Sequence, residues 1–264
     1  MTQPYRELRL NRRGLTAKLI EKGTGEPVLY LHGALLSKGW NPFLEILSGN
    51  HTVFAPIQPG FEEVEGLESL HDVVDLALYY LDMLDELGVE SALIVGHFLG
   101  GMVAAEMAAL EPHSVAGLAL VAPAGFWRKD VPVRDIFVLG DGEIREEMWY
   151  CSQSASALEA VPDQESDEER AVRIMERSID LAAAGKFLWP IPERGLSRRI
   201  HRVRAPTLLV WGEDDRIVPL AYAEEFSSRI ERAKTTVMPA CGHLPMLEQP
   251  EALAVTVGEF FRDI

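Results

Sequence analysis

Short apolar runs alternate with longer amphipathic stretches along most of the chain. The runs that predict strands cover residues 5–10, 15–21, 27–31, 51–57, 92–95, 117–122 and 206–212. The first two of these favour an antiparallel hairpin. Apolar residues then recur at helical spacing over residues 70–84, and Gly88 supplies a stop for that helix. The alternation predicts an α/β fold with a mostly parallel twisted sheet and helices on both faces.

The strand signals disappear over a long middle stretch. Between residues 125 and 203 the pattern indicates helices and loops only, and Ser166 followed by Glu169 is typical of a capping box at a helix start. We therefore expect a core domain made of residues 1–124 and 204–264, with residues 125–203 inserted as a helical cap. A cap placed over the carboxyl ends of parallel strands would cover the crevice where α/β proteins bind ligands.

Length and charge limit the classes of partner. A chain of 264 residues fits one large α/β domain with or without an insertion. The formal net charge of −16 argues against nucleic acid and anionic membrane surfaces, because both require basic patches. A small apolar substrate or ligand is the partner that we expect, and the sequence leaves the oligomeric state open, a homodimer included.

The sequence gives no sign of a membrane segment or a disulfide framework. No apolar run approaches the roughly 18 residues of a membrane span, and the first residues lack an apolar signal region, so we expect a cytoplasmic protein. Cys151 and Cys241 form neither a metal-type pair nor a disulfide framework. Neither a dinucleotide fingerprint, a phosphate loop nor a zinc motif occurs, and we expect no cofactor and no metal.

Residues 92–101 carry the most informative motif. The segment predicts a strand, a tight turn and a helix, and Gly96 and Gly100 frame the turn as in the G-x-S-x-G nucleophile elbow. The central residue, however, is Phe98. A phenyl ring has no lone pair to attack a carbonyl and no proton for a base to remove. Covalent catalysis through this position is therefore blocked.

Two further motifs follow in the order nucleophile, acid, histidine. Residues 212–219 place carboxylates after a predicted strand, and residues 241–250 present His243 after another strand end. Residues 32–34 read His-Gly-Ala directly after a predicted strand. With these motifs in this order, the chain resembles the α/β-hydrolase superfamily over nearly its whole length, within it the esterases and carbon–carbon bond hydrolases with a helical cap.

The resemblance implies a role for each matching residue. Asp215 matches the triad acid, because it stands directly before the segment that ends in Val-Pro, whereas the neighbouring Asp214 matches a turn-capping carboxylate. His243 matches the base. The backbone N–H groups of Ala34 and Leu99 match the two oxyanion donors, which a substitution at residue 98 need not abolish. His97 matches a residue that packs beside the elbow.

Four aromatic residues are candidates for the pocket wall. Phe126, Trp127 and Trp189 belong to the expected cap, and Trp40 follows the His-Gly-Ala turn. Each ring also suits a purely structural role, packing the cap or the core. The resemblance further implies that the elbow residue adopts a positive φ, a strained conformation that Phe98 has no reason of its own to accept.

Three hypotheses about function follow from Phe98. The chain is a hydrolase of esters or carbon–carbon bonds that has lost its serine and is inactive or strongly impaired. Alternatively, His243 held by Asp215 acts directly as a general base, as in a lyase or cyclase, with Phe98 as pocket wall. As a third alternative, the protein binds a ligand without turnover. Space for a ligand between the Phe98 ring and the imidazole distinguishes the second hypothesis from the others.

Overall fold

The computed structural model describes residues 5–191 and 193–264; residues 1–4 and 192, which the predicted core and cap include, lie outside the described residues. Its centre is an eight-stranded sheet with the order β1-β2-β4-β3-β5-β6-β7-β8. The β1–β2 and β2–β4 pairs are antiparallel, and every further neighbour pair is parallel. The predicted mostly parallel sheet is confirmed.

The strands lie close to where the apolar runs predict them, except for the last strand, over Ala233–Met238. No apolar run marks that strand, since only its final residue, Met238, is buried. The strands are β1 (Arg6–Leu10), β2 (Leu15–Lys22), β3 (Glu26–Leu31), β4 (His51–Pro56), β5 (Ala92–His97), β6 (Val115–Val121), β7 (Thr207–Gly212) and β8 (Ala233–Met238). The predicted hairpin is confirmed, because Leu10 pairs with Leu15 where β1 turns into β2. All residues of β5 and β7 are buried, as expected for central strands of a sheet covered on both faces.

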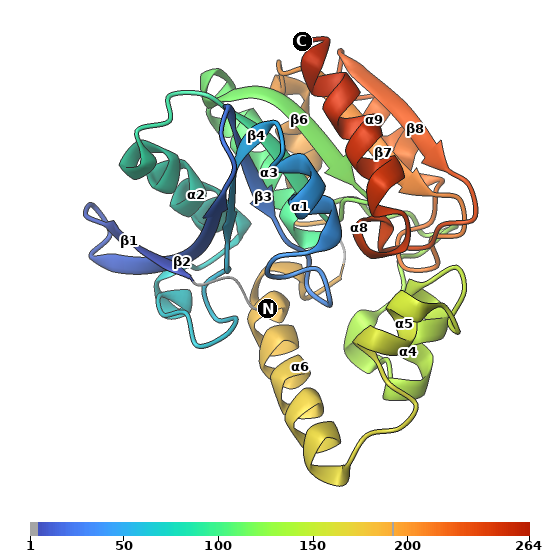
Figure 1. The fold of residues 1–264 in the computed structure, drawn as a ribbon. Coiled ribbons are helices and arrows are strands. Elements are labelled where there is room, and N and C mark those ends of the chain that lie inside the picture. Colours follow the sequence, from blue (N-terminus) through green and yellow to red (C-terminus); the bar gives the residue numbers. More distant parts are fainter. Residues whose placement is uncertain (1–4, 192) are drawn as a thin grey trace.

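Helices cover both faces of the sheet, as Figure 1 shows: α2 (Val73–Leu87) and α3 (Leu99–Leu110) on one, α1 (Pro42–Leu47) and α9 (Pro250–Arg262) on the other. Helix α2 starts where the Asp72 side chain accepts hydrogen bonds from the N–H groups of Val74 and Asp75. It ends at Gly88, whose φ of 71° confirms the predicted stop. Two shorter helices complete the core, α7 (Tyr222–Ser227) and α8 (Pro245–Glu248).

The chain between β6 and β7 is helical, and we call this segment the helical insertion. Its longer helices are α4 (Asp141–Met148), α5 (Ala155–Ala160) and α6 (Asp167–Leu188). The predicted capping box begins α6: Ser166 Oγ accepts from the Glu169 N–H, and the Glu169 carboxylate accepts from the Ser166 N–H. In Figure 1 the insertion lies below the sheet, with α6 set apart from α4 and α5.

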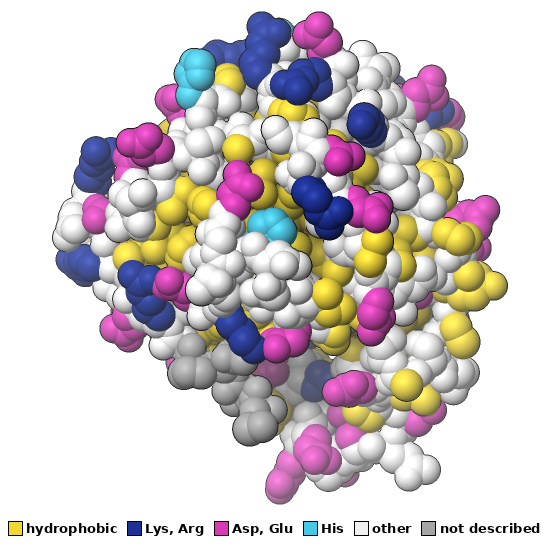
Figure 2. Space-filling view, turned by 45° about the horizontal axis from the view of Figure 1, so that its top comes forward, with side chains coloured by type: hydrophobic (Ala, Val, Ile, Leu, Met, Phe, Trp, Pro, Cys, Tyr) yellow, Lys and Arg dark blue, Asp and Glu magenta, His cyan; other side chains and the backbone are white. Residues whose placement is uncertain are grey.

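The surface mixes charges of both signs with apolar side chains. Figure 2 shows acidic and basic side chains interspersed over one face, with apolar side chains between them. Within residues 5–191 and 193–264, no helix combines the length and the apolarity that crossing a membrane requires.

Candidate active site

The sheet brings the predicted site residues to one edge. The parallel strands β3 and β5 pair with Leu31 opposite Gly96, so residues 32–34, which follow β3, lie beside residues 97–99 at the end of β5. Strands β7 and β8 pair with Gly212 opposite Met238, and their following loops carry Asp215 and His243. The edge at the carboxyl ends of parallel strands is where α/β proteins bind ligands.

The turn at Phe98 has the backbone of a nucleophile elbow. Phe98 joins β5 to α3 with φ 47° and ψ −108°, and its N–H donates to the carbonyl of Val121 at 3.1 Å. Helix α3 approaches the sheet so closely that a Cβ on Gly100 would lie 2.0 Å from the Leu31 carbonyl oxygen. The expected positive φ is therefore observed, and for a bulky residue this conformation costs roughly 1–3 kcal/mol.

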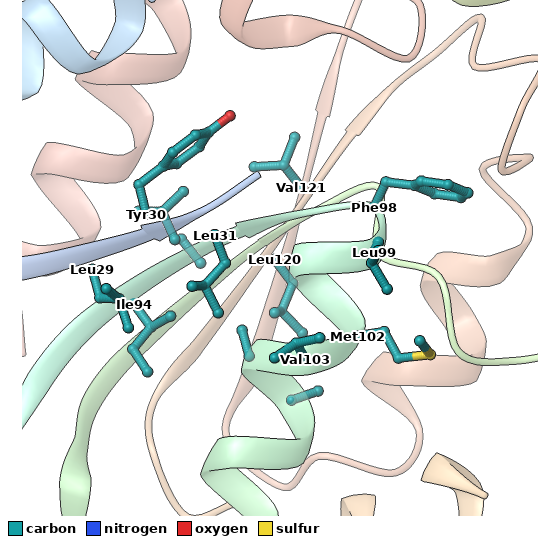
Figure 3. Close-up of a cluster of buried hydrophobic side chains, with 14 of the residues drawn as sticks. Leu29, Tyr30, Leu31, Ile94, Phe98, Leu99, Met102, Val103, Leu120 and Val121 are labelled. Carbon is teal, nitrogen blue, oxygen red and sulfur yellow. The ribbon is translucent and has the colours of Figure 1, made fainter. Parts of the chain in front are cut away.

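The Phe98 ring points away from the hydrophobic core beneath the turn. Figure 3 shows it projecting from the turn, while Leu99, Met102 and Val103 continue along α3 below it. The ring centroid lies 5.1 Å from the His243 imidazole, with an interplanar angle of 82°. Both residues are buried. The phenyl ring thus contacts the imidazole edge to face.

Asp215 and His243 form a buried hydrogen-bonded pair. His243 Nδ1 donates to Asp215 Oδ2 at 2.8 Å. The other carboxylate oxygen, Oδ1, accepts from the N–H groups of Ile217 and Val218, each at 2.9 Å. Because the carboxylate is held from both sides, it keeps the proton on Nδ1 and leaves the lone pair on Nε2. Asp215, and not Asp214, is the partner of the histidine.

The second imidazole nitrogen has no partner. His243 Nε2 is buried, and it makes no hydrogen bond with any described residue. Leaving a buried acceptor unsatisfied costs about 1–3 kcal/mol. A serine hydroxyl at the elbow would donate to this atom in a hydrolase triad, and here the Phe98 ring contacts the imidazole instead.

The turn at residues 32–34 is held by His32. Its Nδ1 donates to the Gly33 carbonyl at 2.7 Å, and its Nε2 accepts from the N–H of Gln58 at 3.0 Å. Burial lowers the pKa of His32 to about 4, so the ring is neutral near pH 7. Neither the Ala34 N–H nor the Leu99 N–H donates to a backbone acceptor among the described residues outside the helices and strands.

A network that the sequence does not predict links this turn to His243. The Gly33 N–H donates to Ser37 Oγ at 2.7 Å, and the Ser37 hydroxyl donates to His97 Nδ1 at 3.0 Å. His97 Nε2 donates to the His243 carbonyl at 2.9 Å. Burial, and then the neighbouring His243, hold the pKa of His97 well below its usual range, in keeping with a neutral ring. No motif in the sequence marks Ser37.

A small, mostly apolar cavity lies beside the Phe98 ring. Its apolar lining includes Phe98, Met102, Phe126, Ile136, Phe137 and Val218. The charged side chains of Arg134, Glu193 and Arg194 also reach it. His243 is not among the described residues that line the cavity. Phe126 is therefore the one predicted aromatic that faces this space.

The other three predicted pocket residues are not among the described residues that line this cavity. Trp40 is half-buried and packs against the hydrophobic core; its Nε1 donates to Glu45 Oε2 at 2.7 Å, and Lys22 approaches its ring. Trp127 is half-buried outside the lining. Trp189 follows α6 and is 54% exposed, and its ring centroid lies 5.8 Å from that of Phe137. Among residues 5–191 and 193–264, no cluster of His, Cys, Asp and Glu could hold a metal ion.

Comparisons with known proteins agree with the observed fold. The family model described as the alpha/beta hydrolase fold matches residues 26–250. The chain is 26% identical over 267 residues to 2-hydroxy-6-oxo-2,4-heptadienoate hydrolase of Pseudomonas putida, covering 94% of this chain and 93% of the relative. It is also 26% identical over 265 residues to 2-hydroxy-6-oxo-6-phenylhexa-2,4-dienoate hydrolase of Burkholderia cepacia, covering 92% and 91%.

Solved structures of low sequence identity share the fold. A meta-cleavage product hydrolase from Pseudomonas fluorescens IP01 has a TM-score of 0.78 at 21% identity, covering 98% of this chain and 97% of that chain. A thermophilic esterase from Thermogutta terrifontis has a TM-score of 0.73 at 22% identity, covering 98% of each chain.

Proposed function

Because the chain belongs to the α/β-hydrolase fold family, we propose that its site is that of a hydrolase of carboxylic esters or carbon–carbon bonds in which Phe98 replaces the nucleophilic serine. With a hydroxyl at residue 98, His243 would take its proton and Asp215 would hold the imidazole tautomer. The N–H groups of Ala34 and Leu99 would stabilise the tetrahedral oxyanion. With Phe98, no covalent intermediate forms, and turnover is lower on the order of a million-fold.

The unpartnered Nε2 of His243 carries this proposal. Asp215 holds the ring in the tautomer that a base requires, yet Nε2 has no hydrogen-bond partner among the described residues, and the rings of Phe98 and His97 pack against the imidazole. A buried acceptor without a donor is destabilising, so a purely structural histidine has no reason to keep this arrangement. The arrangement is explained if the His243 imidazole is oriented to accept a hydrogen bond from a serine hydroxyl at position 98, which Phe98 does not have.

The relatives and the cavity together support the substrate class. The two relatives are named for hydrolysis of 2-hydroxy-6-oxo-dienoates, one of them with a phenyl group. The aromatic and aliphatic lining beside Phe98 suits the apolar part of such a molecule. On this proposal residues 125–203 act as a cap over the core, and the partner is a small apolar molecule that needs no cofactor.

A ligand-binding protein without turnover is the second candidate. The apolar cavity is present beside Phe98 even though the ring separates it from the imidazole. The same contacts argue against His243 as a direct general base. Its Nε2 is buried against protein, and a base must lie within hydrogen-bond reach of the proton that it removes.

The experiment compares the parent, Phe98→Ser, Phe98→Ala, His243→Ala and the Phe98→Ser/His243→Ala double variant. Each is assayed with 4-nitrophenyl acetate and with 2-hydroxy-6-oxo-6-phenylhexa-2,4-dienoate, and binding of the dienoate to the parent is measured by calorimetry. We expect turnover in Phe98→Ser alone. Binding without turnover in every variant would favour the ligand-binding protein. Turnover in the parent that disappears in a His243→Ala variant would favour the general base.

A further inference from the structure

The loop that presents His243 is held by a carboxylate on the helix that follows it. Glu248 ends α8, and its Oε1 accepts hydrogen bonds from the N–H groups of Gly242 at 2.9 Å and Leu244 at 3.4 Å. These two residues flank His243. One carboxylate oxygen therefore fixes the backbone on both sides of the residue that carries the imidazole.

The second oxygen of Glu248 binds the helical insertion. Its Oε2 accepts from the N–H of Tyr150 at 2.8 Å, and the His243 N–H donates to the carbonyl of Met148 at 2.8 Å. The N–H groups of residues 242–244 are thus all accepted, either by Glu248 or by the end of α4. The His243 loop and the insertion share one hydrogen-bond network.

The two segments touch without intervening space. A Cβ on Gly242 would lie 2.7 Å from the Tyr150 nitrogen and 2.8 Å from the Met148 carbonyl oxygen. Only glycine allows this approach. A displacement of residues 148–150 is therefore transmitted directly to the backbone beside His243.

The same end of α4 also contacts the loop of the acid. Arg216, which follows Asp215, donates through Nη1 to the carbonyl of Trp149 at 3.0 Å and to the carbonyl of Glu146. Figure 1 shows α4 beneath α8, near the ends of β7 and β8. Residues 146–150 thus bind both loops that present the Asp215–His243 pair.

Helix α4 also borders a cavity between the helical insertion and the core. Ile144 lines this second cavity, whose lining includes Leu35 and Leu36, directly after Ala34, and charged residues of α6. A ligand in this cavity would contact α4 within one turn of the segment that binds His243. Such a ligand would therefore affect the position of the His243 imidazole.

We propose that Glu248 is a positioning residue, which couples the placement of His243 to the seating of residues 146–150. When this segment is seated, the flanking N–H groups are fixed and Nδ1 reaches Asp215. When it moves, the His243 backbone moves with it. The kinetic consequence rests on the function proposed above, whereas the coupling itself exists in the parent protein.

The test uses Glu248→Ala and Glu248→Gln, with the exposed Glu259→Gln as the matched control. In the parent, amide hydrogen exchange is measured at Gly242, Leu244 and Tyr150, together with the proton resonance of His243 Nδ1–H. We expect Glu248→Ala to speed exchange at these amides by about tenfold or more and to broaden the Nδ1–H resonance. The control should change neither. Glu248→Gln keeps one acceptor oxygen, so it should lose protection on one side only.

In the Phe98→Ser background, Glu248→Ala should lower kcat by about 100-fold and leave KM within about twofold, because misplacing the base affects the transition state. Unchanged exchange and an unchanged Nδ1–H resonance in folded Glu248 variants would overturn the proposal, as would an unchanged kcat. If Glu248→Ala does not fold, Glu248→Gln decides by the same criteria. If Phe98→Ser is inactive, the proposed function fails, and the exchange measurement still decides this inference.

Discussion

The Phe98 ring lies edge to face against the His243 imidazole, with the ring centroids 5.1 Å apart. His243 is at the same time fixed by Asp215, and its Nε2 has no hydrogen-bond partner within the described residues. The contact therefore joins two residues that each carry an energetically unfavourable feature. One is an apolar ring in a strained backbone, and the other is an oriented base without its donor.

The strain at residue 98 predicts that a glycine there is more stable than an alanine, the reverse of the usual order inside a helix or strand. Phe98→Gly should be more stable than Phe98→Ala by about 1–2 kcal/mol, because glycine accepts the φ of 47° at no steric cost. Urea unfolding followed by circular dichroism measures the difference. At the exposed helical position Ala171, the replacement Ala171→Gly should instead destabilise by about 1 kcal/mol. Equal stability of the two residue 98 variants would mean that the turn carries no strain.

The buried His32 predicts a loss of stability in mild acid. Its folded pKa of about 4 lies below the ordinary value of 6.5, so the unfolded chain takes up the proton first as the pH falls. The contribution of the buried His32 to the free energy of unfolding is fully present above pH 6.5 and declines as the pH falls toward 4. Over this window it amounts to about 3 kcal/mol of unfolding free energy.

Unfolding free energies of the parent and His32→Gln, measured across this pH window, isolate the effect. Glutamine can donate to the Gly33 carbonyl and accept from Gln58, but it does not titrate. The variant should therefore show the weaker pH dependence. The same slope of unfolding free energy against pH in both proteins would contradict a neutral, buried His32.

Ser37 predicts a large effect from the loss of one hydroxyl. Ser37→Ala removes the acceptor of the Gly33 N–H and the donor to His97 Nδ1, both of them buried. We expect a loss of about 2–3 kcal/mol in unfolding free energy. The exposed Ser197→Ala should change stability by less than about 0.5 kcal/mol. Similar values for the two variants would mean that the link from the turn to His97 is not stabilising.

Local patterns predict most of the fold, and the resemblance to a known family supplies the dyad. The hairpin, Gly88 and the Ser166 capping box each depend on residues near in sequence, and parallel strands bring their carboxyl ends to one edge whatever the loops do. Asp215 and His243 follow two neighbouring parallel strands, so their meeting follows from the topology.

The cavity wall and the supporting contacts could not be predicted in this way. Which face Trp127 or Trp189 presents depends on the path of the insertion, and apolar composition alone does not determine that path. The roles of Ser37 and Glu248 arise from hydrogen bonds to backbone groups, which leave no pattern in the sequence. An isolated serine or glutamate gives no signal of this kind.

The most direct test of the account is covalent labelling of Phe98→Ser by a fluorophosphonate, followed by intact-protein and peptide mass spectrometry. Such a reagent bonds to a serine that a base activates. The account predicts stoichiometric labelling at position 98 in Phe98→Ser, none in the parent, and a loss of labelling rate of at least about 1,000-fold in Phe98→Ser/His243→Ala. A folded Phe98→Ser protein that remains unlabelled, or one that labels equally fast without His243, would contradict it.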